Sequence, residues 1–262
     1  GTAGDALWSA LSNWDSGESA TGKNIVFDDT AASDTAGVVT NTVDADVTVA
    51  SITFENSEGQ YHTTAVNDGN TLAIESASGR GRIYVAQNAH IDGRLAGSKG
   101  LTKTGAGTLS LGGAASAMTV ASGVTVADGT LRLDQPDLGF DVGVFTSATP
   151  LRVEANGILE IAQKFNVKHS TPITVAGGTL AITANSVEDS SNYINNLRLD
   201  GGTVTGNGIR VGYLLSDAVF TVTGNATSTI SNPIVLVNNV DQTGTRTLTL
   251  DVADGSAAYD LV

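Results

Sequence analysis

Three pairs of carboxylates come closest, by residue type and spacing, to the chemistry of a catalytic site. Two facing carboxylates can act as acid and base, or as nucleophile, on a glycosidic bond. The pairs are Asp28 with Asp29, Asp44 with Asp46, and Glu188 with Asp189. Because neighbouring residues of a strand point to opposite faces, only Asp44 and Asp46 would share a face within a strand. We expect structural or solvated roles for all three pairs, and therefore no enzyme activity.

Metal, thiol and nucleotide chemistry have little support in the sequence. The chain has no cysteine, which excludes disulfides and thiolate metal sites. Its three histidines, His62, His90 and His169, lie far apart and form no His-x-x-x-His pair. The glycines of the stretch 105–107 belong to a strand-like repeat, which argues against a phosphate-binding loop. We expect neither a metal nor another cofactor.

The charge balance excludes two kinds of partner and leaves one local exception. With 13 basic and 27 acidic residues the net charge is −14, which disfavours nucleic acids and anionic membrane surfaces. No apolar run is long enough for a transmembrane helix, so we expect no membrane insertion. One stretch is locally basic and contains Arg80, Arg82, Arg94, Lys99 and Lys103. These side chains could form a patch for an acidic glycan or an acidic neighbour, but we favour ordinary solvated surface charge.

A repeated phrase, glycine followed by Thr-Leu or Thr-Val, indicates how the chain is built. The glycines that open the phrase are Gly107, Gly129, Gly178 and Gly202. The apolar residues that close it are Leu109, Leu131, Leu180 and Val204. The first and last gaps are each about 20 to 25 residues, and the middle gap is about twice as long, as two turns would be; such a period is typical of a solenoid.

Short alternating stretches and a particular composition narrow the fold class. Alternating segments such as 71–74 and 131–133 predict strands of about three to six residues, separated by Asp-Gly and Asn-Gly turns. Aromatic residues make up 5% of the chain, so Val, Leu, Ile and Ala must fill a narrow core. A sandwich or antiparallel barrel would show longer strands without a fixed phrase. The sequence therefore predicts an all-β fold, a right-handed parallel β-helix of roughly eleven coils.

The two ends of the chain differ in character. Both tryptophans, Trp8 and Trp14, lie near the start, and Leu7, Leu11 and Trp14 have the spacing of a helix face or of a first irregular strand. We expect residues 1–24 to cap a β-helix of residues 25–262, in preference to an exposed aromatic platform for sugars. The last residues read as a strand, which predicts an end open to a next coil or subunit. The small polar residues 1–5 fit a chain that follows a signal-cleavage site.

Two segments resemble a known family. The stretches 101–111 (LTKTGAGTLSL) and 124–133 (VTVADGTLRL) resemble the autotransporter-associated β-strand repeat of bacterial surface proteins, whereas the intervening residues 114–119 depart from it. The resemblance implies a right-handed β-helix exported to the cell surface or beyond, with a repeat that assists folding and secretion. No catalytic residue belongs to the motif.

Together these patterns predict a non-enzymatic, extracellular β-helical module of a bacterial surface protein, such as a stalk, a filament subunit or an adhesin. Its expected partners are neighbouring subunits at the solenoid ends and a glycan or other cell-surface ligand. The main alternative is a secreted β-helix enzyme acting on glycans. A third interpretation, ice binding through Thr-x-Thr pairs, is weak because the pairs that begin at 203, 221 and 247 are too unevenly spaced for one flat array.

Overall fold

The computed structural model describes most of the chain and contains almost only strands. The residues described are 6–28, 38–55, 61–112, 118–136, 143–145, 149–184, 192–212, 216–236, 247–257 and 260–262. Their single helical element is a 3₁₀ turn, η1 (Leu11–Asn13). Within these ranges, no helix has the length and apolarity needed to cross a membrane.

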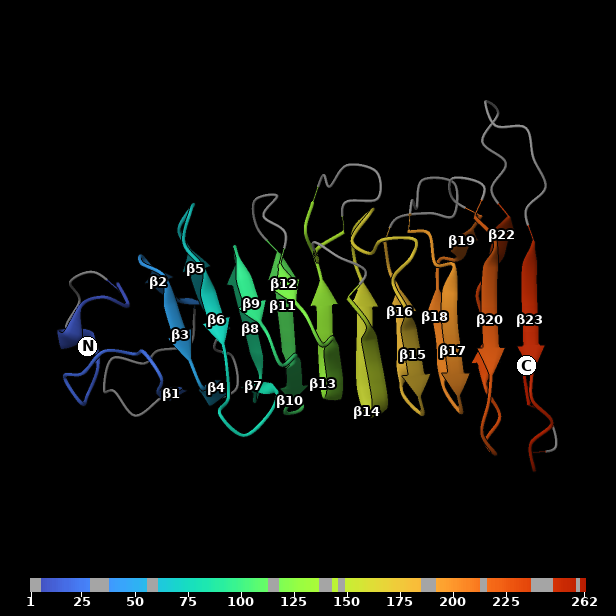
Figure 1. Ribbon diagram of the computed structural model, residues 1–262, viewed down its shortest axis with the longest axis horizontal. Coiled ribbons are helices and arrows are strands. Elements are labelled where there is room, and N and C mark those ends of the chain that lie inside the picture. The colour runs from blue at the N-terminus through green and yellow to red at the C-terminus, as the bar shows by residue number, and fades with distance from the viewer. Residues whose placement is uncertain are drawn as a thin grey trace.

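The longest stack of strands forms one side of a parallel β-helix. All its neighbours pair in parallel, and the strands lie side by side along the long axis of the molecule (Figure 1). In spatial order they are β1 (Asn24–Asp28), β4 (Ser51–Glu55), β7 (Gly81–Val85), β10 (Leu101–Thr104), β13 (Val124–Leu133), β14 (Leu151–Ile161), β15 (Ile173–Ala176), β17 (Asn196–Asp200), β20 (Ala218–Val222) and β23 (Leu248–Val252). We call this stack the first ladder.

Two further sides complete the coils. The second ladder stacks β2 (Val38–Val43), β5 (Tyr61–Val66), β8 (Asn88–Asp92), β11 (Thr108–Gly112), the second halves of β13 and β14, β16 (Thr179–Ile182), β18 (Thr203–Gly206) and β21 (Thr229–Ile230). The third side holds β3 (Val47–Val49), β6 (Leu72–Ile74), β9 (Leu95–Gly97) and β12 (Thr119–Val120), and a separate pair, β19 (Ile209–Val211) with β22 (Ile234–Leu236). The predicted parallel β-helix is confirmed.

The number and length of the coils differ from the prediction. In the described residues the first ladder joins ten strand segments, fewer than the roughly eleven coils expected. The coil that leads from Ser51 to its stacked partner Arg82 is about half as long again as the coil from Arg82 to Thr102. The extra residues lie between the strands, so a coil can lengthen without disturbing the ladder.

The repeated phrase contributes one stack of the core. Leu109, Leu131, Leu159, Leu180 and Val204 pair in register on the second ladder and are at most 1% exposed. Alternate residues of the same strands face outward, as expected for a period of two. The sequence phrase thus marks the strands whose leucine or valine fills the interior.

Close packing between coils explains a glycine in this phrase. A Cβ atom on Gly107 would overlap the Gln87 carbonyl of the preceding coil. Gly129 has a φ of +63°, a conformation that favours glycine, and lies where β13 bends from the first ladder into the second.

Aromatic packing joins the N-terminal segment to the first coils. Trp8 is only 4% exposed, and its ring lies 5.4 Å from that of Trp14 and 5.9 Å from that of Phe27. Leu7 forms a parallel bridge with Thr42, which adds a partial strand to the edge of β2. Leu11 is 50% exposed, so Leu7, Leu11 and Trp14 do not form one packed helix face. The division at residues 24 and 25 stays a prediction.

Candidate functional site

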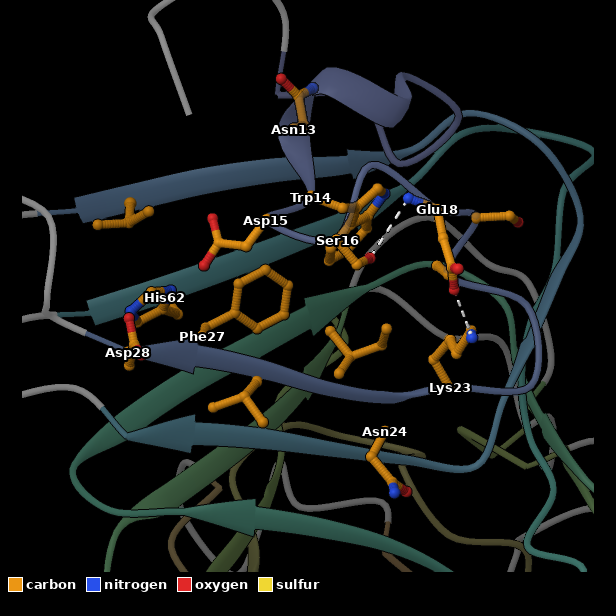
Figure 2. A pocket seen from close by; sticks show the side chains of 15 residues that line it. Asn13, Trp14, Asp15, Ser16, Glu18, Lys23, Asn24, Phe27, Asp28 and His62 are labelled. Carbon is orange, nitrogen blue, oxygen red and sulfur yellow. Dashed lines mark hydrogen bonds and ion pairs between the residues drawn. The ribbon is translucent and has the colours of Figure 1, made fainter.

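A groove beside β1 is the first candidate site, and aromatic and charged side chains line it (Figure 2). Its volume is about 720 Å³, and its walls come from residues 13–28 together with Val39 and His62. The Phe27 ring stacks on Phe54 at 5.3 Å and lies 6.4 Å from Trp14. These rings pack on one another and on the first coil, which favours a structural cap over a sugar platform.

Two polar contacts at this groove lie within the N-terminal segment itself. Lys23 Nζ lies 2.6 Å from Glu18 Oε2, and its hydrogen bond and charge lower the pKa of that carboxyl. The Trp14 indole N–H donates to the Trp8 carbonyl at 2.9 Å. These two contacts hold the N-terminal segment in its folded form. Neither of them positions a group that could react with a ligand.

Asp44 and Asp46 hold other parts of the chain. Asp44 accepts hydrogen bonds from the Ser9 amide at 3.0 Å and from the Ser9 hydroxyl at 2.5 Å. The hydroxyl bond is the main cause of a lowered pKa, so Asp44 stays ionised and is poorly suited to act as a general acid. Asp46 accepts from the Thr71 amide at 2.7 Å. Asp29, Glu188 and Asp189 lie outside the described residues.

The histidines occupy three different environments. His62 is 3% exposed and its ring lies 5.7 Å from both Phe27 and Phe54. His90 lies on β8, and His169 lies in the turn before β15. In the described part of the chain, no three His, Asp or Glu side chains are grouped as metal ligands would be.

The structure corrects the place of Lys103 in the predicted basic patch. Lys103 is 1% exposed and points into the core, where its ammonium group donates to the carbonyls of Gly105, Gly107 and Asp128. Burial lowers its pKa to about 8. The three N–H donors of an ammonium group match the three carbonyls, so Lys103 closes a corner and is inaccessible to a surface partner.

The other four basic residues are also divided. Arg80 donates to the carbonyls of Ser122 and Leu101, at 3.0 and 3.1 Å, and to a third at Gly123. Lys99 donates to two carbonyls of the preceding corner, Ser76 at 3.0 Å and Ala77 at 3.1 Å. Arg80 thus reaches past the next coil to the corner that precedes Val124, and Lys99 binds a corner of the adjacent coil.

Arg82 and Arg94 remain as exposed cations on different sides of the solenoid. Arg82 lies on β7 of the first ladder, and Arg94 precedes β9 on the third side. The five predicted residues therefore do not form one patch.

The second ladder carries a charged network that was not predicted from the sequence. Arg132 bridges Asp134 at 3.0 Å and Glu160 of the next coil at 2.7 Å. Burial raises the pKa of Asp134, but hydrogen bonds from Gln163 and Arg132 outweigh it, and the pKa is lowered overall. With both carboxylates paired to one guanidinium, the network links neighbouring coils. Glu160 lies farther along the sequence from Arg132 than one period of the phrase, so the repeat spacing does not predict the pair.

The fold and these contacts define a class of protein, a parallel β-helix whose polar side chains largely join one coil to the next. No family model matches the chain, and no solved structure matches it. The chain is similar to the adhesin BmaC autotransporter of Brucella suis biovar 1 (strain 1330), with 30% identity over 187 residues. The match covers 71% of this chain and 5% of that protein, so the chain spans only a small part of that relative's length.

Proposed function

We propose that the chain is a non-enzymatic β-helical module of an exported bacterial surface protein, in which it serves as an adhesin or a structural stalk. The observation that carries this proposal is the parallel β-helix, taken together with the similarity to part of an autotransporter adhesin. The resemblance of 101–111 and 124–133 to the autotransporter-associated repeat supports the same assignment.

The mechanism of such a module is geometric. Stacked parallel strands hold a rod whose core is apolar and whose outward rows are polar, so its sides can present ligand-binding groups at fixed intervals. The rod needs no reacting group for this role. Its net charge of −14 keeps copies apart along their sides.

The ends of the stack are proposed as sites where a neighbouring coil, of the same or another chain, continues the ladder. Strand β23 pairs with β20, and its Leu250 and Val252 are 51% and 43% exposed. A further strand on this edge would cover apolar surface and pair backbone groups. Sedimentation of the purified chain over a range of concentrations tests this part of the proposal, and a monomer at every concentration would reject self-assembly.

Adhesion itself is tested with beads coated with the purified chain. We expect the beads to adhere to host cells or extracellular matrix, and beads coated with Leu159→Asp, which places a carboxylate in the core, to lose adhesion. An unrelated β-helix of similar net charge is the second control. Adhesion equal to that of the unrelated protein would reject the adhesin role.

The alternative function, a secreted enzyme that acts on glycans, can be tested directly by a cleavage assay. Asp44 and Asp46 each accept a backbone hydrogen bond. We therefore expect no cleavage of acidic or neutral polysaccharides by the purified chain. Cleavage that disappears in an Asp44→Asn, Asp46→Asn variant would establish the enzyme instead.

A further inference from the structure

Three arginines that are far apart in the sequence fall on one outward row of the first ladder. The register runs from Arg82 through Thr102 and Thr125 to Arg152, and then through Thr174 to Arg198. We call these six residues the arginine row. Neighbouring parallel strands are about 4.8 Å apart, so the three steps from Arg82 to Arg152 span about 14 Å and the two steps to Arg198 about 10 Å.

The three guanidinium groups are available to a ligand. All three arginines are exposed, while the threonines between them are partly buried. Among the described residues, Arg82 and Arg198 form no ion pair, and the Arg82 guanidinium lies 6.0 Å from the centre of the Tyr84 ring. Arg152 lies 3.5 Å from Glu154, and both side chains are about half exposed. An exposed pair of this kind contributes little to stability, so Arg152 can exchange Glu154 for another anion.

The two borders of the row differ in charge. Glu154 and Asp200 lie two residues after Arg152 and Arg198. On the opposite border, the positions two residues before each member of the row are Arg80, Gly100, Gly123, Pro150, Pro172 and Asn196. This border contains no acid and mostly small side chains. At its N-terminal end the row leads into a hollow of about 530 Å³ that Ser51, Arg80 and Arg82 help to line.

We propose that the arginine row binds a linear polysaccharide in which uronic acid sugars alternate with neutral sugars. This rests on the proposed function and names the class of ligand for one side of the rod. Each guanidinium binds a carboxylate through two parallel hydrogen bonds. The threonine hydroxyls between the arginines donate to and accept from sugar hydroxyls.

The sparse charge of the row favours this ligand over denser polyanions. Its arginines are about 10 and 14 Å apart, whereas duplex DNA carries one negative charge per ~1.7 Å of its axis. A nucleic acid would meet three cations on a protein of net charge −14. A polymer with one carboxylate per disaccharide is far less densely charged than duplex DNA, as the row is, and a straight chain of sugars follows a straight row of side chains.

Binding to immobilised hyaluronan, a polymer with one carboxylate per disaccharide, tests the proposal with the purified chain at low salt. We expect Arg82→Gln, Arg152→Gln and Arg198→Gln each to weaken binding about 2- to 5-fold, and the triple variant more than about 10-fold. Glu154→Gln frees Arg152 and should strengthen binding about 2-fold. Raising the salt should weaken binding of the native chain, because the groups are exposed.

The matched control is Arg94→Gln, which makes the same charge change on the third side of the solenoid. It should bind hyaluronan as the native chain does. The proposal is overturned if the native chain does not bind at low salt, if the triple variant binds as Arg94→Gln does, or if duplex DNA binds as tightly as hyaluronan. Circular dichroism of each variant separates loss of binding from loss of fold.

The bead assay distinguishes failure of this proposal from failure of the proposed function. Beads that adhere to cells while the purified chain ignores hyaluronan would reject the arginine row as a glycan site and leave the adhesin role intact. Hyaluronan binding by a chain whose beads do not adhere would support the arginine row as a glycan site and reject the adhesin role.

Discussion

A buried ammonium group is the least expected side chain of the solenoid. Lys103 stacks in register between Ile83 and Val126, so the same core row holds two apolar residues and one cation. A charge in the core is tolerated only when its hydrogen bonds are made, and Lys103 makes three. In the repeat phrase this lysine therefore organises the corner that follows it.

Replacing Lys103 with Met tests that role. Three carbonyls lose a donor, so we expect the free energy of unfolding to fall by about 1–3 kcal/mol. The folded pKa of about 8 lies below the ordinary value of 10.5, so between these values the unfolded state binds more protons. Lys103 therefore makes the native chain more stable as the pH rises through this window, and Lys103→Met loses this rise.

Urea denaturation at a series of pH values measures both effects of the Lys103 variant. Arg94→Met, which removes an exposed cation from the third side of the solenoid, is the control. Equal dependence on pH in the native chain and in Lys103→Met would show that Lys103 does not titrate in this window.

Gly107→Ala tests the close approach of adjacent coils. The new methyl group would overlap the Gln87 carbonyl, and a backbone atom cannot move aside as a flexible side chain does. We expect a loss of about 1–3 kcal/mol in thermal or urea unfolding. Gly79→Ala, where nothing lies within 4 Å of the added atom, should leave stability nearly unchanged.

At the scale of the strands, the sequence correctly predicts the strands that follow the Gly-Thr-Leu phrase. It does not predict that some strands continue through a corner. The alternation in 108–111 and 130–133 gives the correct inward leucines. Strands β13 and β14, however, are 10 and 11 residues long and run through a corner, so each belongs to two ladders. The Asp128-Gly129 pair reads as a turn in the sequence, whereas the structure continues the strand through it.

The candidate surfaces were less predictable than the strands. The basic cluster of 80–103 is compact in sequence, yet its members lie on a strand, in corners and in the core. The arginine row depends on stacking across five coil steps, from Arg82 to Arg198. Because the coils differ in length, no fixed sequence period reveals such a register.

Asp44→Ala tests how the N-terminal segment is held on the first coils. Ser9 loses both hydrogen bonds to Asp44, so we expect the local stability of residues 6–20 to fall by about 0.5–1.5 kcal/mol. The amide hydrogens of these residues should therefore exchange faster. The combined fluorescence of Trp8 and Trp14 should shift toward that of a solvated indole, while the amides of the ladders stay protected. Asp68→Ala, at an exposed turn, is the control. Unchanged exchange in residues 6–20 would show that aromatic packing alone holds the segment.

At the scale of the whole molecule, stability should vary along the rod. In a solenoid each coil contacts mainly its neighbours. Strands β13 and β14 share nine register pairs, whereas β18 and β21 share two. We expect amide exchange to be slowest in β13 and β14 and fastest in β21, as measured by mass spectrometry of peptides. Uniform exchange along the ladder would indicate one cooperative unit instead.

The variable coil length also has a mechanical consequence. The hydrogen bonds of the ladders run along the rod, so tension applied to its two ends acts on successive coils as on links in series. A coil of about 20 to 30 residues that gives way would add roughly 70 to 100 Å of extended chain while its neighbours stay folded. Coils that unfold one after another would let the rod extend under load without breaking. The gain in length at each unfolding event would be set by the number of residues in the coil that opens.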